Sequence, residues 1–119
     1  MKSIIRYINE SKKSFTISPD DREALATLLG FAVGDLGDDD DIAQFELFVN
    51  DLSEDEKICL QDLSDLFGDT NNYPKITHMN LNKEEKLLIN KFLNYIEDNC
   101  DNLLDEYSYE IGNLEEIFL

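Results

Sequence analysis

The sequence predicts an all-α fold that allows one minor short strand near the N-terminus. We expect a compact bundle of four to five helices with a long C-terminal helix. Three observations carry this prediction: apolar residues recur every three or four positions, capping residues precede these stretches, and only two prolines occur in 119 residues. Because this length matches one ordinary domain, we expect residues 1–119 to fold as a single acidic helical domain.

The first helix of that domain is predicted from its ends. Residues 1–17 form a basic N-terminal segment, in which Phe15-Thr16-Ile17 is typical of a short strand. Ser18-Pro19 supplies a capping hydroxyl and a proline at the first helical position, so a helix should begin there. Leucines at helical spacing follow, and Gly34 and Gly37 predict the stop.

Two further helices complete a group of three short helices in residues 18–67. The second should begin in the acidic run 38–41 and place five apolar residues on one face, namely Ile42, Phe45, Phe48, Val49 and Leu52. The third opens at Ser53, because Glu56 stands three residues later in the spacing of a capping box. It should end before Gly68.

A loop and one long helix account for the rest of the chain. Residues 68–81 are predicted to be a loop, since they are rich in Asp, Asn and Thr. Residues 82–119 should form the long helix plus an apolar terminus, with Asn82 as the cap. We expect this helix to run for about 25 residues, to break at Gly112-Asn113, and to be followed by an apolar end that packs on the body.

The net charge of −17 limits the classes of partner. A field of this sign repels nucleic-acid phosphates and anionic lipids, so we expect no direct binding to nucleic acid or membrane and instead expect a basic protein surface as partner. No apolar run of the sequence is long enough to span a bilayer, and we expect no secretory signal in the residues from Met1 to Tyr7. We therefore expect a cytoplasmic protein whose Cys59 and Cys100 are reduced thiols in the apolar core.

Acidic side chains fall into two blocks of different character. In the middle block, many stand at predicted helix N-termini, where the helix dipole favours anions. In the C-terminal block, Glu97, Asp101 and Asp105 lie four residues apart on one predicted helix face, and Glu106 and Glu110 repeat that spacing beside it. Like charges at this spacing repel, so folding alone does not favour this charge ladder of Glu97, Asp101 and Asp105. A binding face is one interpretation, and a merely solvated acidic face is the other.

Three tyrosines are the candidate aromatic anchors of such a face. Tyr107 and Tyr109 follow the acidic residues of the last helix, and Tyr73 lies in the predicted loop. Interfaces use tyrosine inside a charged rim, because its ring buries apolar area while its hydroxyl keeps a polar partner. The alternatives are that Tyr107 completes the apolar stripe of the helix and that Tyr73 packs the loop beside Pro74.

Catalysis and cofactor binding are not expected. His78 is the only histidine, neither cysteine has a CxxC partner, and no glycine-rich phosphate loop or nucleophile elbow occurs. Residues 35–46 match a calcium loop poorly, since glycine is missing at its sixth position, where Asp40 stands. We therefore expect no enzyme, no metal site and no cofactor.

The leading hypothesis is a stoichiometric inhibitor or immunity protein that covers the basic active site of a nuclease toxin or another nucleic-acid-handling enzyme. Asn72-Tyr73-Pro74, with acidic helices around it, resembles the immunity proteins of nuclease bacteriocins, which are small acidic helical bundles with a Tyr-Tyr-Pro segment that contacts the toxin. Asn72 stands here in place of the first tyrosine. The resemblance implies toxin neutralisation, with Tyr73 at the interface.

Two alternatives use the same features differently. A phage-encoded nucleic-acid mimic would present the charge ladder to a host defence complex, because carboxylates rising about 6 Å per four residues approximate the charge spacing of a nucleic-acid strand. A phage virion or assembly component is the other alternative. Its support is Ile8-Asn9-Glu10, which resembles the end of the short leaders cut from phage head proteins.

Overall fold

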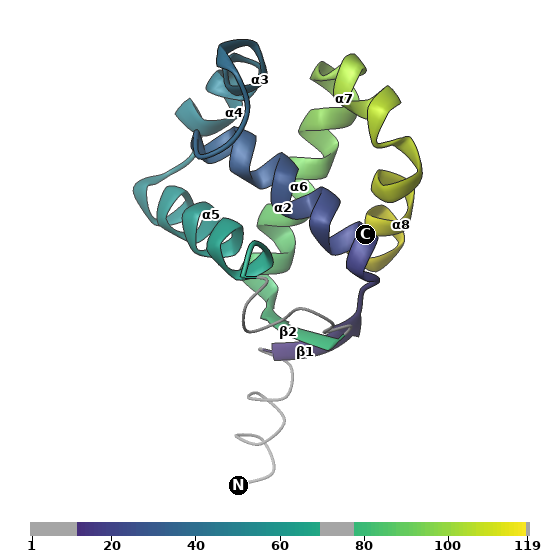
Figure 1. Ribbon diagram of the computed structural model, residues 1–119. Coiled ribbons are helices and arrows are strands. Elements are labelled where there is room, and N and C mark those ends of the chain that lie inside the picture. The colour runs from purple at the N-terminus through teal and green to yellow at the C-terminus, as the bar shows by residue number, and fades with distance from the viewer. Residues whose placement is uncertain (1–11, 70–77, 119) are drawn as a thin grey trace, which may run out of the picture.

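Helix α2, Pro19–Val33, crosses the middle of the molecule and begins and ends where its sequence predicts (Figure 1). The computed structural model describes residues 12–69 and 78–118. The Ser18 side chain accepts a hydrogen bond of 3.1 Å from the Asp21 N–H at the start of the helix. Gly34 ends it with φ 82°, a conformation that only glycine adopts without strain.

The next predicted helix is divided into two. Helix α3 spans Asp39–Ala43 and helix α4 spans Glu46–Asn50, with Gln44 and Phe45 between them. The break follows from packing, since the Phe45 ring is fully buried and the Gln44 carbonyl accepts a hydrogen bond of 2.8 Å from the Tyr95 hydroxyl. The prediction of one continuous helix here was wrong, although Phe45, Phe48 and Leu52 do face the core as expected.

Helix α5, Glu54–Phe67, confirms the predicted capping box. The Ser53 hydroxyl accepts from the Glu56 N–H at 3.1 Å, and the Glu56 carboxylate accepts from the Ser53 N–H at 3.0 Å. Both donors would otherwise be unpaired at the helix start, which is why this short sequence sets the boundary. The helix lies beside α2 and buries Leu60, Leu63 and Phe67 against it.

A two-stranded antiparallel sheet lies at one end of the helices (Figure 1). Strand β1, Lys12–Thr16, pairs with strand β2, His78–Asn82, with Phe15 opposite Met79. The first strand confirms the short N-terminal strand of the prediction. The second corrects the predicted loop 68–81, because His78–Asn82 pairs with a segment more than sixty residues away in the chain, and no local pattern shows that partner.

The C-terminal part folds as three helices instead of one long helix. Helix α6 spans Lys83–Asn99, α7 spans Asp101–Glu106, and α8 spans Ser108–Phe118. The break falls at Cys100, which has φ −124° and ψ 64° and a buried side chain, whereas Gly112-Asn113 lies inside α8. This turn brings the buried residues of α8 back against α2 and α6, which a straight helix would carry away from the core.

The outcome is a mostly helical bundle with a minor sheet, as predicted. The described part of the chain contains seven helices, more than the expected four to five, because two predicted helices are divided. The helices and the sheet share one hydrophobic core. It includes the stacked rings of Phe45 and Phe92, whose centroids are 5.3 Å apart. The apolar terminus packs on the body as expected: Phe118 is buried against Phe15, and its carbonyl accepts from Asn90.

Candidate partner-binding site

The predicted charge ladder does not lie on one helix. Glu97 belongs to α6, whereas Asp101 and Asp105 belong to the six-residue helix α7 beyond the break at Cys100. Asp101 therefore stands in the first turn of a helix, where the dipole stabilises it, instead of opposing a dipole near a helix end. The sequence-based premise that folding disfavours all three acids was wrong for Asp101, although all three side chains are exposed.

Glu97 instead lies beside a carboxyl group, that of Glu115, whose position near Glu97 no local sequence pattern predicts. Glu115 of α8 is half-buried, and its pKa is raised by burial, by the charge of Glu97, and by a hydrogen bond with Glu97. The two like charges lie at the contact between α6 and α8. Their repulsion lowers the stability of the fold at neutral pH.

Replacing Glu115 by glutamine is expected to raise stability at pH 7. Because the pKa of Glu115 is raised on folding, the folded state favours the protonated carboxyl. That contribution to stability is fully present below the ordinary pKa of glutamate and is lost as pH rises through the folded pKa. Glu115→Gln should thus gain a few tenths of a kcal/mol at pH 7, a gain limited by solvent screening, and nothing at pH 3.5. Thermal melts at both pH values test this, and an equal effect at both would contradict it.

Tyr107 is the residue around which acidic side chains gather. Its pKa is raised first by burial and then by the charges of Glu106, Asp41, Glu110 and Glu23. These four acids come from α7, α3, α8 and α2, so the fold collects them from separate elements. The ring is half-buried and packs against the core, which agrees with the alternative that Tyr107 completes the apolar stripe.

A groove of about 240 Å³ opens beside Tyr107, between α2 and α8. We call it the Tyr107 groove. Its lining comprises three acids, two small residues of α2 and the tyrosine: Asp20, Glu23, Ala24, Thr27, Tyr107 and Glu110. No basic side chain is among these residues, so the groove presents negative charge beside an aromatic face.

Two helix starts and one hydrogen bond hold the walls of the Tyr107 groove. Asp20 lies in the first turn of α2, and Glu110 lies in the first turn of α8, so both carboxylates stand where helix dipoles stabilise anions. The Asn113 amide donates to the Asp21 carboxylate at 3.2 Å and ties α8 to α2 directly behind these turns. The groove can therefore hold several acids close together while the helices that carry them stay folded.

The acids of the Tyr107 groove lack basic partners among the described side chains, those of residues 15–69 and 79–118. The ion pairs between these residues are Lys57 with Glu54 and Lys91 with Glu56, each at 3.4 Å, and both involve α5. Carboxylates that are concentrated and not neutralised within the described structure are available to an external cation.

No protein-family model, curated protein or solved structure matches this chain. We therefore argue function from the residues of the Tyr107 groove and from the charge that surrounds them.

The structure brings together some of the predicted site residues and separates others. Glu106, Tyr107 and Glu110 converge at the Tyr107 groove. Tyr109 is 77% exposed on α8, and its role as an aromatic anchor stays a prediction. Tyr73 lies outside the described residues. Glu97, Asp101 and Asp105 are not among the lining or the charges that act on Tyr107, and a binding role for them stays a prediction.

Sequence reasoning missed Asp20, Glu23 and Asp41. Asp41 belongs to the acidic run 38–41, which the sequence explains as a helix N-terminus, and the structure does show Asp41 in a capping box with Asp38. Nothing local indicates that these acids lie near Tyr107, about 65 to 85 residues later in the chain. A periodic pattern reports which face of a helix is apolar, but it does not report which helices become neighbours.

Among the described side chains, those of residues 15–69 and 79–118, no three His, Cys, Asp or Glu come close enough to hold a metal ion. Burial raises the pKa of the Cys100 thiol to about 11, and burial also raises the pKa of Cys59. Neither thiol is activated as a nucleophile. The described helices include none that is long and apolar enough to cross a bilayer.

Proposed function

We propose that this protein is a non-catalytic, cytoplasmic inhibitor or immunity protein that binds the basic active site of a nuclease toxin or another nucleic-acid-handling enzyme. The observation that carries the proposal is the convergence of Asp20, Glu23, Asp41, Glu106 and Glu110 around Tyr107. An active site that binds nucleic acid is rich in Lys and Arg, and its field is complementary to this surface.

The Tyr107 groove suits a lysine or arginine side chain of such an enzyme. The cation could contact the carboxylates of Glu23 and Glu110 while its aliphatic stem lies on the half-buried tyrosine ring. Charge-assisted hydrogen bonds in a partly desolvated groove are stronger than exposed ion pairs, because fewer water molecules compete. Tyr109 would then supply apolar contact beside the charged centre.

An inhibitor is preferred here over a nucleic-acid mimic. The mimic depended on regularly spaced carboxylates along one continuous helix, and the chain turns at Cys100 between Glu97 and Asp101. The acids around Tyr107 converge on one groove instead of following a line. Convergent charge suits one central anchor of an interface, with the remaining acids as its rim.

The test is capture of a partner on the immobilised protein, followed by binding and activity measurements with the purified partner. We expect a basic enzyme, a dissociation constant that rises steeply between 50 and 300 mM salt, and loss of enzyme activity at a one-to-one ratio. Binding that is independent of salt, or self-assembly of the protein without a partner, would contradict the proposal.

A further inference from the structure

A second groove contains a buried positive charge that the proposed function does not use. Arg22 of α2 is only 5% exposed, and its Nε and Nη1 atoms have no hydrogen-bond partner among the described side chains of residues 15–69 and 79–118. Buried guanidinium groups are nearly always paired, because an unpaired buried charge is strongly unfavourable. Arg22 therefore has donors available for a group that the described part of the chain does not supply.

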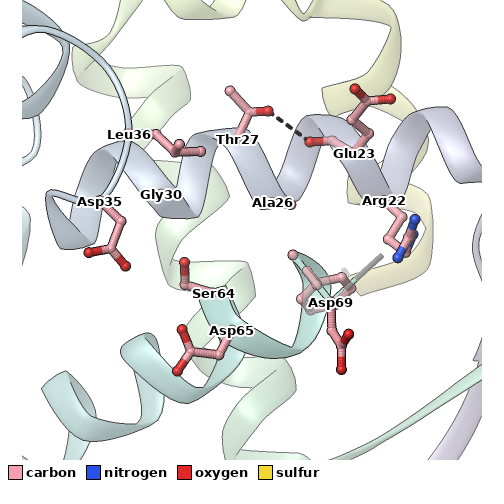
Figure 2. Close-up of a pocket in the computed structure, with 12 residues that line it drawn as sticks. Arg22, Glu23, Ala26, Thr27, Gly30, Asp35, Leu36, Ser64, Asp65 and Asp69 are labelled. Atoms are coloured by element: carbon pink, nitrogen blue, oxygen red, sulfur yellow. Dashed lines mark hydrogen bonds between the residues drawn. The ribbon is translucent and has the colours of Figure 1, made fainter. Parts of the chain in front are cut away.

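Arg22 lines a groove of about 680 Å³ between α2 and the end of α5 (Figure 2). We call it the Arg22 groove. Its size is that of a ligand site, and Ala26, Gly30 and Phe67 contribute apolar or small walls. Figure 2 shows the guanidinium directed from α2 toward the end of α5, with Asp35 and Asp65 toward the other end of the groove.

The end of the groove away from Arg22 carries a pair of carboxylates. The Gln61 side-chain amide donates to Asp35 Oδ2 and to Asp65 Oδ1, each at 3.1 Å, and so links the turn after α2 to α5. Each carboxylate keeps a second oxygen that can accept from a cation. The groove is therefore dipolar, with donors at one end and acceptors at the other.

The charge of the lining excludes a simple anion as the best ligand. Among the described lining residues, Glu23, Asp35 and Asp65 alone carry three negative charges against the one positive charge of Arg22. A phosphate dianion would gain one favourable contact and meet at least three unfavourable ones. The complementary ligand has a net positive charge and a single carboxylate that reaches Arg22.

The dimensions of the groove suit a short extended peptide. Arg22 and Gly30 are eight residues apart on α2, which corresponds to about 12 Å, and about four extended residues span that distance. Because Arg22 is almost fully buried, a group that reaches it comes more easily from a chain end than from the middle of a chain.

We propose that the Arg22 groove binds the basic C-terminal segment of a partner protein. The terminal carboxylate accepts from Arg22, apolar side chains lie along Ala26 and Phe67, and a Lys or Arg side chain three or four residues upstream lies between Asp35 and Asp65. This is a second site, because the Tyr107 groove shares only Glu23 and Thr27 with it.

The test uses a five-residue peptide with the order Lys, Lys, Leu, Ala, Leu and a free C-terminal carboxylate, together with the same peptide ending in an amide. The chain has only two arginines, so the Nε–H signal of Arg22 is readily followed by NMR, with Arg6 as an internal reference. We expect the free acid to bind at least tenfold more tightly than the amide and to shift the Arg22 signal but not that of Arg6.

Two variants separate this site from the Tyr107 groove. Arg22→Met should fold with equal or higher thermal stability, because an unpaired buried charge is replaced by an apolar chain, and it should lose the preference for the free acid. The variant Tyr107→Phe with Glu110→Gln should keep both peptide affinities, whatever happens to its binding of the basic enzyme.

The proposal is overturned if neither peptide binds, if the acid and the amide bind equally, or if Arg22→Met keeps the preference. Inorganic phosphate that shifts the Arg22 signal at lower concentration than the peptide would identify a simple anion site and would also overturn it. Should Arg22→Met fail to fold, the Arg22 signal of the unaltered protein still decides between these outcomes.

Discussion

Neutralising Glu23, Glu106 and Glu110 together, each to glutamine, is expected to weaken binding of the basic partner by at least a hundredfold. These acids come from three elements and act on the same tyrosine. Each charge-assisted hydrogen bond to a partner contributes about 1.5 to 3 kcal/mol, and tenfold in affinity corresponds to about 1.4 kcal/mol, so three lost contacts exceed a hundredfold. Titration calorimetry with the captured enzyme measures the change.

A control with the same change in net charge separates local contacts from long-range attraction. Asp55, Asp62 and Glu84 are exposed acids near Cys59, at the junction of α5 and α6. The charges of Asp62 and Glu84 act on Cys59, and Asp55 lines the same surface hollow as Cys59 and Glu84. Their replacement by Asn, Asn and Gln should slow association modestly and change the affinity by less than tenfold. Equal losses in the two triple variants would mean that only net charge matters, and the Tyr107 groove would not be the binding site.

The sequence-predicted ladder supplies a further comparison for the same experiment. If neutralising Glu97, Asp101 and Asp105 lowers the affinity for the partner as strongly as the groove variant does, the interface extends over α7 and the end of α6. If it does not, these residues form a solvated acidic face, and the structure already explains Asp101 by its position at the start of α7.

Replacing Phe92 by alanine is expected to lower the free energy of unfolding by about 3 to 5 kcal/mol. Phe92 of α6 is fully buried, stacks on Phe45, and contacts the Phe48 ring with centroids 5.5 Å apart. Truncation removes the contacts that hold the α3–α4 segment on α6 and leaves a cavity. The total free energy of unfolding of a small domain is only about 5 to 15 kcal/mol, so the variant should be only marginally folded. Urea denaturation followed by circular dichroism gives the value.

Two companion substitutions show whether the loss reflects this ring stack. Phe92→Leu keeps most of the side-chain volume and should lower the free energy of unfolding clearly less than Phe92→Ala does. Tyr109→Ala, at a side chain that is 77% exposed, should change stability by less than about 0.5 kcal/mol. A loss for Phe92→Ala as small as that for Tyr109→Ala would contradict the packing around Phe92.

Phe92→Ala also links the fold to the site. Asp41 belongs to α3, and the neighbouring Phe45 and Phe48 are the residues that anchor this segment to the core. If the segment loosens, Asp41 no longer has a fixed place near Tyr107, and the affinity for the basic partner should fall even where the rest of the bundle stays folded.

Local sequence determined the helix boundaries that depend on capping. Ser18, Ser53 and Asn82 each accept from a backbone N–H three residues later, and each helix starts at the predicted position. These boundaries are readable because the donor, the acceptor and the first turn lie within four residues. Apolar periodicity likewise predicted the helical class, and composition determined the negative net charge of the chain.

Only the tertiary structure decided where helices break and which acids meet. The turn at Cys100, the division at Phe45 and the pairing of β1 with β2 all depend on contacts with residues far along the chain. Burial of a side chain in a common core outweighs the weak local preference for a continuous helix. The same contacts place Glu23 beside Glu110 and Asp35 beside Asp65, so both grooves are properties of helix packing that no single stretch of this sequence contains.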